Sequence, residues 1–364
     1  MTRRPERPTD RPPGARKPNS RRALPPYPAP RVGSWDGAPP RRPPRRPGPR
    51  PGPRPNEPTR AVRRRQSQRR RNNRRGGCGF FVVSLFILIF ALVYFFAGDR
   101  LFSGEIIMPG DGEIIISFLD VGQGDSILLR SANNAVLIDG GEHRARNVVM
   151  NYLRDAGISR LDYVIATHPH SDHIGGLVTV LGRVEVGRLA MPDVTHNTQT
   201  FENFLEAIEN NDIDVFSPAP GDRIRAGIID LTVIAPPARP PGRPQGGNLN
   251  NYSIVVRLVY GRTSFLFTGD AEMESEQQML ANGIAISSDV LKIGHHGSRT
   301  STTEAFLAAV DPTYAVITVG AGNQFGHPHR EVTDRLAARG VQVYRTDYHG
   351  TIRMITNGQR IYFP

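Results

Sequence analysis

The chain has 364 residues, and its basic residues are concentrated at one end. Residues 1–77 hold 24 of the 46 Lys and Arg residues but four of the 34 acidic residues, a net charge of +20; the remaining residues carry 22 basic and 30 acidic side chains, a net charge of −8. The overall charge of +12 therefore comes from residues 1–77 alone, and it is no evidence for a nucleic-acid-binding domain in the rest of the chain. A single cysteine, Cys78, excludes an intrachain disulfide framework and a cysteine-based zinc site.

Residues 1–77 are predicted to be a disordered, Arg/Pro-rich cytoplasmic tail. They contain 19 prolines among the arginines and few apolar residues, so they cannot form a core. The tail is either an electrostatic arm for anionic lipid or nucleic acid, or a solvated basic segment that sets membrane topology. Its simple composition favours the second interpretation.

Residues 79–97 are predicted to form one transmembrane helix. These 19 residues carry no charge and would span the hydrocarbon core of about 30 Å. A cleavable signal peptide is disfavoured, because the charged region before it is too long and Phe95 would lie where cleavage needs a small residue. The arginines that precede the helix predict a single-pass protein of the cell membrane, with a cytoplasmic N-terminus and an extracytoplasmic catalytic domain.

After a linker at residues 98–111, residues 112–364 are predicted to form one α/β domain. Four apolar runs in it end at polar residues, which are Asp139, His168, Asp270 and the pair His295 and His296. In layered α/β folds such strand ends meet at one edge of a sheet. Residues 147–155 have helical spacing with Gly157 as the C-cap, and residues 235–247 are expected to be an exposed loop.

The strongest local motif is ThrHisProHisSerAspHisIleGlyGly at residues 167–176. His168 and His170 can face one metal ion, because the intervening proline keeps the chain extended. Asp172 and His173 begin the next turn and can face a second ion. Imidazole and carboxylate suit zinc and, with more carboxylate character, manganese or iron. The density of ligands disfavours a merely hydrogen-bonded polar loop.

This motif resembles the HxHxDH signature of the metallo-β-lactamase superfamily. Further segments resemble, in order, the C-terminal metallo-hydrolase domain of ComEC-type competence and DNA-uptake proteins; they are PheLeuAspValGlyGlnGlyAspSer (118–126), LeuIleAspGlyGly (137–141), AsnAsnTyrSer (250–253), PheThrGlyAspAlaGlu (267–272), LysIleGlyHisHisGlySer (292–298) and AsnGlnPheGlyHisProHis (323–329). The similarity covers residues 114–364. It implies an αββα sandwich with the metal ions at one sheet edge, and a metal-dependent hydrolase.

The resemblance also implies a ligand set for two divalent metal ions. The residues are His168 and His170 for the first ion, Asp172 and His173 for the second, Asp270 as a bridge, and His295 or His296 as the last ligand of the second ion. Asp139 would lie beneath the site and fix an imidazole or the attacking water.

The chain departs from the superfamily pattern at the first metal site. Many members have a third histidine shortly before the bridging aspartate, but here His196 lies too early and Asn250, Asn251 and Ser253 occupy that stretch. We therefore expect the first site to be weak, with manganese possible in preference to zinc.

Two divalent ions would activate a bridging hydroxide for hydrolysis and neutralise charge on a phosphoryl or acyl group. Asp172 or Asp139 would orient the attacking hydroxide. His327 and His329 are candidates to act on the leaving oxygen, with a structural turn as the alternative.

Two further features allow two interpretations each. Lys292, the only lysine after residue 17, can contact phosphate or pair with a carboxylate at the strand edge. Gln123 and Asp125 can reach the metal ions' surroundings or only close a turn, and the first is slightly favoured.

The predicted function is a membrane-anchored phosphodiesterase or nuclease with single-stranded DNA or another phosphodiester as substrate. The alternatives are a hydrolase of another envelope ester, such as a teichoic-acid phosphoester or a lactone, and a noncatalytic binding subunit. The acidic domain implies shallow, salt-sensitive DNA contacts. No protein partner is indicated, and one helix does not make a DNA-uptake channel.

Overall fold

The computed structural model describes residues 107–236 and 248–364. The predicted tail (1–77), the predicted transmembrane helix (79–97), residues 98–106 of the predicted linker and residues 237–247 of the predicted loop lie outside the described residues. Within the described ranges, no helix has the length and apolar character needed to cross a bilayer.

The described residues form two β-sheets. The first has the strand order β15-β14-β1-β2-β3-β4-β5-β6 and the second β13-β12-β11-β10-β9-β8-β7. Strands of the first sheet are β1 (Ile114–Phe118), β2 (Ile127–Arg130), β3 (Ala135–Ile138), β4 (Arg160–Ile165), β5 (Glu185–Ala190), β6 (Val215–Phe216), β14 (Ile352–Thr356) and β15 (Ile361–Tyr362). Strands of the second are β7 (Arg223–Ala226), β8 (Ile229–Ala235), β9 (Val255–Tyr260), β10 (Thr263–Phe267), β11 (Val290–Lys292), β12 (Tyr314–Ile317) and β13 (Gln342–Arg345).

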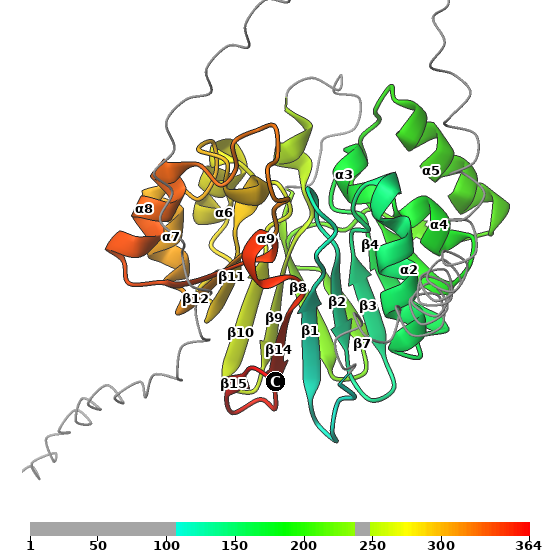
Figure 1. The fold of residues 1–364 in the computed structure, drawn as a ribbon, viewed down its shortest axis with the longest axis horizontal. Coiled ribbons are helices and arrows are strands. Elements are labelled where there is room, and N and C mark those ends of the chain that lie inside the picture. The colour runs from blue at the N-terminus through cyan, green and yellow to red at the C-terminus, as the bar shows by residue number, and fades with distance from the viewer. Residues whose placement is uncertain (1–106, 237–247) are drawn as a thin grey trace, which may run out of the picture. The chain divides into compact units, whose positions relative to one another are not determined.

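Helices cover the outer faces of both sheets, as Figure 1 shows. Those beside the first sheet are α2 (Arg146–Asp155), α3 (Ser171–Ile174), α4 (Leu177–Leu181) and α5 (Gln199–Asn210). The later helices are α6 (Met273–Ala281), α7 (Glu304–Val310), α8 (Arg330–Ala338) and α9 (Thr346–His349). The predicted helix at residues 147–155 is confirmed as α2, and Gly157 after it has the left-handed φ of 65° that glycine allows.

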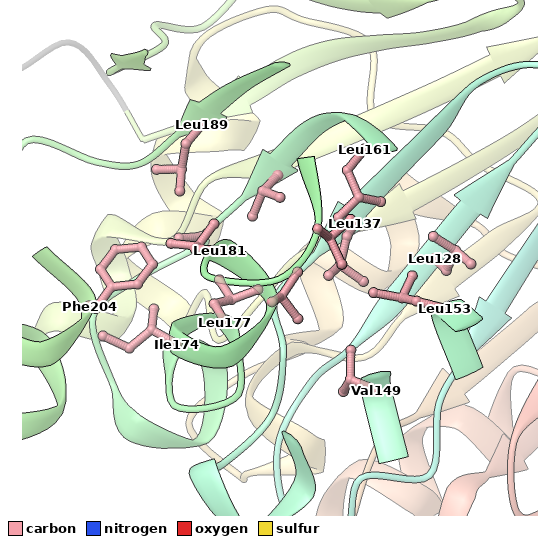
Figure 2. Packing of buried hydrophobic residues seen from close by; sticks show 14 of the residues in the cluster. Leu128, Leu137, Val149, Leu153, Leu161, Ile174, Leu177, Leu181, Leu189 and Phe204 are labelled. Carbon is pink, nitrogen blue, oxygen red and sulfur yellow. The ribbon is translucent and has the colours of Figure 1, made fainter. Parts of the chain in front are cut away.

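Three apolar layers hold these elements together. One lies between the first sheet and its helices, where Leu128 and Leu137 from the strands pack with Leu153 and Leu177 from the helices (Figure 2). A corresponding layer joins α6, α7 and α8 to the second sheet. Between the sheets, the rings of Phe118 in β1 and Phe267 in β10 are 6.1 Å apart. The order helix, sheet, sheet, helix confirms the predicted αββα sandwich.

Strand direction brings the predicted polar residues to one side of the sandwich. β3 and β4 are parallel, as are β10 and β11, so each pair ends at the same edge of its sheet. Asp139 follows β3, His168 follows β4, Asp270 follows β10 and His296 follows β11. We call this side of the sandwich the ligand edge.

Candidate metal centre

The first group of ligands lies in and before α3. The chain leaves β4 at Ile165, His170 precedes the helix in extended conformation, and Asp172 and His173 lie in its only turn. The backbone N–H of Gly140 donates to the carbonyl of His173 at 2.7 Å, which fixes this turn against the loop after β3. Gly124 makes a second close approach, because a Cβ there would lie 2.2 Å from the carbonyl oxygen of Asp172.

The second group of ligands follows β10 and β11. His295 and His296 both have left-handed backbone conformations, with φ of 47° and 54°. This conformation is costly for residues with a Cβ, and such residues concentrate at functional sites. The turn aims both imidazoles at Asp270: its Oδ2 lies 3.5 Å from Nε2 of His296 and 3.8 Å from Nε2 of His295.

Four side chains converge into a candidate metal site. Ligand atoms of Asp172, His173, Asp270 and His296 all lie within 4.8 Å of one another. Nε2 of His173 is 3.2 Å from Oδ2 of Asp270, and Nε2 of His296 is 3.3 Å from Oδ2 of Asp172. Of the two histidines that the sequence left open for the second ion, His296 therefore belongs to this set.

The donor atoms of this set fit a metal ion. Nδ1 of His173 lies 2.8 Å from a carboxylate oxygen of Asp139, and Nδ1 of His296 lies 2.9 Å from the carbonyl oxygen of Thr318. Both partners can only accept, so in the neutral, metal-binding form of each imidazole the proton lies on Nδ1 and the lone pair lies on Nε2. Nε2 of His173, Nε2 of His296 and Oδ1 of Asp270 are buried without a hydrogen-bond partner. Buried polar atoms are rarely left unpaired, and a divalent ion would satisfy these.

The carboxylates in the set favour positive charge at this position. Burial lowers the pKa of His296, but the carboxylates of Asp270 and Asp172 outweigh it and raise the pKa to about 10. Burial also lowers the pKa of His173, but the surrounding aspartates outweigh it and raise this pKa well above the usual value. Burial raises the pKa of Asp270, yet these two imidazoles hold it well below the usual range. Without metal, the two imidazoliums therefore supply the positive charge.

Asp139 lies directly beneath this set, where the sequence predicted it. It is fully buried, with a φ of 56°. Its Oδ1 accepts from the backbone N–H of Thr167 at 2.8 Å, and its Oδ2 accepts from the Thr167 hydroxyl at 2.7 Å and from His173. Asp139 thus orients an imidazole. The role of Thr167 was not predicted, although it begins the motif quoted above.

The residues predicted for the first ion, His168 and His170, form a less complete ligand set than the one described above. Nε2 of His168 lies 3.0 Å from Nδ1 of His170 and 3.8 Å from Oδ2 of Asp270. Among the described residues, neither histidine belongs to a set of three ligand atoms within 4.8 Å. The ring of His196 is 5.4 Å from that of His170, close in space although early in the sequence.

The segment that stands in place of the third histidine supports the site from behind. Ser253 accepts a hydrogen bond from the backbone N–H of Asp270 at 3.1 Å. The Asn250 amide donates to Glu272 at 2.8 Å, and Glu272 lies 2.8 Å from Nδ1 of His295. Burial raises the pKa of Glu272, but these hydrogen bonds, chiefly the one to His295, outweigh burial and lower the pKa to about 2. Sequence analysis missed Glu272, although it lies two residues after Asp270.

Lys292 is buried at the ligand edge and pairs with a carboxylate, the second of its two predicted interpretations. Its Nζ forms an ion pair with Asp125 and donates to the carbonyl of Gly269 at 2.8 Å. Asp125 also accepts from the hydroxyl of Thr318 and lies 3.5 Å from Nδ1 of His296. The ion pair therefore packs directly against the metal ligands. Gln123, from the same loop, accepts from the backbone N–H of Gly320 at 3.3 Å.

His327 lies at the mouth of the site. Its ring is 5.3 Å from that of His295, and its Nδ1 is buried without a partner. Burial, followed by the neighbouring imidazoles, lowers its pKa to about 4. Asn323 fixes this loop by accepting from the backbone N–H of His327 at 3.0 Å. The ring of His329 lies 4.9 Å from that of His327, and its Nδ1 accepts from the backbone N–H of Arg299 at 3.1 Å.

Comparison with known proteins places this site in a family. A sequence model described as the Metallo-beta-lactamase superfamily matches residues 119–320. The chain belongs to the metallo-β-lactamase superfamily. Its fold and its cluster of Asp and His ligands make it a metal-dependent hydrolase of that superfamily, consistent with divalent ions.

Within the metallo-β-lactamase superfamily, the chain is similar to ComEC-type competence proteins. It is 32% identical to ComE operon protein 3 of Bacillus subtilis over 264 residues. This alignment covers 68% of the present chain and 33% of the Bacillus protein. The chain is 31% identical over 245 residues to competence protein ComA of Neisseria gonorrhoeae (67% and 32%), and 32% identical over 244 residues to recombination protein 2 of Haemophilus influenzae (66% and 28%). The chain thus spans about a third of the length of these relatives.

Proposed function

We propose that this protein is a phosphodiesterase that hydrolyses single-stranded DNA or another nucleic acid with the help of two divalent ions. One observation carries the proposal of two ions: Nε2 atoms of His168, His173 and His296 lie 3.2–3.8 Å from the single oxygen Oδ2 of Asp270, but only His173 and His296 share a compact ligand set with Asp172. A further ion that shares Asp270 would use His168, which the compact set leaves out.

The second ion would be held by Asp172, His173, Asp270 and His296, and the first by His168, His170 and Asp270. Bound divalent ions lower the pKa of a water molecule and neutralise charge on a phosphoryl group. Among the described residues, His168 and His170 do not belong to a set of three ligand atoms within 4.8 Å, which supports the proposal of unequal affinities. Manganese or zinc fits these donors, and manganese is favoured at the carboxylate-rich positions.

The residues around the ions would divide the remaining work. Asp172 keeps 23% of its side chain exposed, and its lowered pKa makes it an acceptor at neutral pH, so it can orient an attacking water. Asp139 is fully buried and acts through His173. His327 is neutral near pH 7 because its pKa is lowered to about 4. It can hold a substrate oxygen by an N–H bond, whereas an imidazolium is not available there to give a proton.

The substrate proposal comes from the relatives. Their names refer to competence and recombination, and the motifs resemble ComEC-type DNA-uptake proteins. Residues 78–364 carry a net charge of −8, so phosphate would be attracted by the metal ions rather than by a basic surface. We further propose that residues 79–97 anchor the chain in the cell membrane with the domain outside, on the basis of their hydropathy and of the arginines that precede them.

The full chain, purified in detergent and stripped of metal, should cleave single-stranded DNA after manganese or zinc is restored. Asp270→Ala should be inactive, and Asp214→Ala, an exposed carboxylate paired with Arg188, should be as active as the original. Cleavage of bis(4-nitrophenyl) phosphate without cleavage of DNA would redirect the proposal to an envelope phosphoester. Inactivity on both, with metal bound, would refute a phosphodiesterase. Protease access to the domain in intact cells tests the membrane topology.

A further inference from the structure

The side of the sandwich opposite the ligand edge contains a cavity of about 180 Å³. It lies where β2 ends and β4 begins, since β2 runs antiparallel to β3 and β3 runs parallel to β4. The polar residues that line it are Arg130, Ser131, Asn133, Asn134, Ser159 and Arg160. A single water needs about 10–15 Å³ on the same measure, so the cavity has room for a polyatomic ligand.

Arg130 is the unusual member of this lining. It is the last residue of β2 and is 7% exposed, and its Nη1 is buried without a hydrogen-bond partner. Burial lowers the pKa of its guanidinium, and no carboxylate of residues 107–236 and 248–364 forms an ion pair with it. An arginine nevertheless stays charged at physiological pH. A buried charge without a counter-ion is strongly unfavourable, and proteins normally pair it.

The second arginine of the cavity does not share this situation. Arg160 donates to Glu185 at 2.9 Å and to Asp162 at 2.7 Å, so its charge is compensated within the protein. Asp162 is also occupied by Asn134, whose amide donates to it at 3.0 Å. The uncompensated positive charge of the cavity therefore belongs to Arg130.

From this cavity and its unpaired guanidinium we infer a binding site for a small phosphate-type oxyanion, either free inorganic phosphate or the terminal phosphate of a small monoester. The planar guanidinium donates to two oxygens of such a group at once. Two exposed polar residues, Asn133 of the β2–β3 turn and Ser159 of the turn before β4, line the same space. An oxyanion with three or four oxygens is large enough to accept from both turns, whereas a chloride ion is a single atom and would not fill the cavity. The site is separate from the metal centre.

Titration calorimetry of the full chain in detergent, with EDTA present, tests this inference with inorganic phosphate and with glycerol 2-phosphate. We expect one phosphate bound per chain, and binding at least about tenfold weaker in Arg130→Gln. The matched control is Arg144→Gln, which removes an exposed arginine paired with Glu142 and should leave binding unchanged. Binding of both compounds indicates a monoester site, and binding of phosphate alone indicates a site for the free anion.

A second variant keeps the test decisive if Arg130→Gln does not fold. Ser159→Glu adds a negative charge at an exposed position of the cavity wall, and it should abolish phosphate binding without disturbing the core. Circular dichroism and thermal melting report whether each variant is folded. The inference fails if phosphate does not bind the original chain, or if folded Ser159→Glu binds phosphate as tightly as the original chain does.

Discussion

Replacing Asp139 with Asn should weaken the second metal site while leaving the fold intact. Asn tolerates the left-handed backbone at this position, where φ is 56°, and its Oδ1 can still accept from the backbone N–H of Thr167. Its amide nitrogen, however, would face the proton on Nδ1 of His173, which now donates to a carboxylate oxygen 2.8 Å away. Two donors cannot pair, so His173 would turn away or move its proton to Nε2, where the metal should bind.

The magnitude follows from the bond that is lost. A hydrogen bond to a charged group contributes about 1.5–3 kcal/mol. Since about 1.4 kcal/mol corresponds to a tenfold change in affinity, the second ion should bind about 10–150-fold more weakly. This agrees with the 10–100-fold losses typical when a residue that orients a metal ligand is changed.

Competition of the protein with a coloured chelator would measure this affinity, because it resolves two ions of unequal strength. Asp214→Asn is the matched control: it removes an equivalent charge from an exposed ion pair with Arg188 and should change neither affinity. If Asp139→Asn left the second ion as tightly bound as before, Asp139 would not orient His173 in the way described. A loss confined to the more weakly bound first ion would contradict the assignment of His173 to the second.

Three further predictions concern the same site. Asp270→Ala should lower the affinity for both ions by more than about 100-fold, measured as metal per chain after dialysis, and retention of either ion would contradict a bridging role. Lys292→Met leaves Asp125 buried without its partner and should lower the free energy of unfolding, measured with urea, by about 3–5 kcal/mol. The double variant Lys292→Met/Asp125→Asn should recover much of this loss, and a loss under about 1 kcal/mol in Lys292→Met would mean that the pair is unimportant. The pKa of His296 is raised to about 10 in the folded protein, so its protonation stabilises the metal-free fold fully below the unfolded value of about 6.5, and this stabilisation is lost as pH rises toward 10. The pKa of Asp270 is lowered, so its ionisation stabilises the fold above about pH 4. The metal-free melting temperature should therefore be highest between about pH 4 and 6.5, and a maximum near pH 9 would contradict these charges.

Much of the fold could be predicted because its signals are local. Apolar runs that stop at Asp139, His168 and Asp270 identified strand ends, and the parallel pairing of β3 with β4 brings the first two of those ends together. The motif at residues 167–176 placed four ligands within six residues, so its chemistry did not depend on distant parts of the chain. The predicted tail, membrane helix and topology lie outside the described residues and remain predictions.

What the sequence could not decide depends on backbone geometry and long-range contacts. The sequence does not distinguish His295 from His296 as a ligand. Both residues have a left-handed backbone conformation, and this geometry places His296 beside Asp172. The pairing of Lys292 with Asp125 joins β11 of the second sheet to the loop between β1 and β2 of the first. The bond from Thr318 to Asp125, 193 residues away in sequence, likewise joins the two sheets' segments. No spacing rule within one segment predicts such pairs.

The division of the ligands between the sheets gives a bound ion a mechanical role. His173 follows a strand of the first sheet, while Asp270 and His296 follow strands of the second. An ion held by all three ties the two halves of the sandwich together across a loop of roughly 100 residues, a length at which a disulfide restricts the unfolded chain by about 4.7 kcal/mol. With Cys78 as its single cysteine, this chain cannot form an intrachain disulfide. Scarcity of metal would then loosen the enzyme's structure as well as stop its chemistry, and protease sensitivity would follow metal supply.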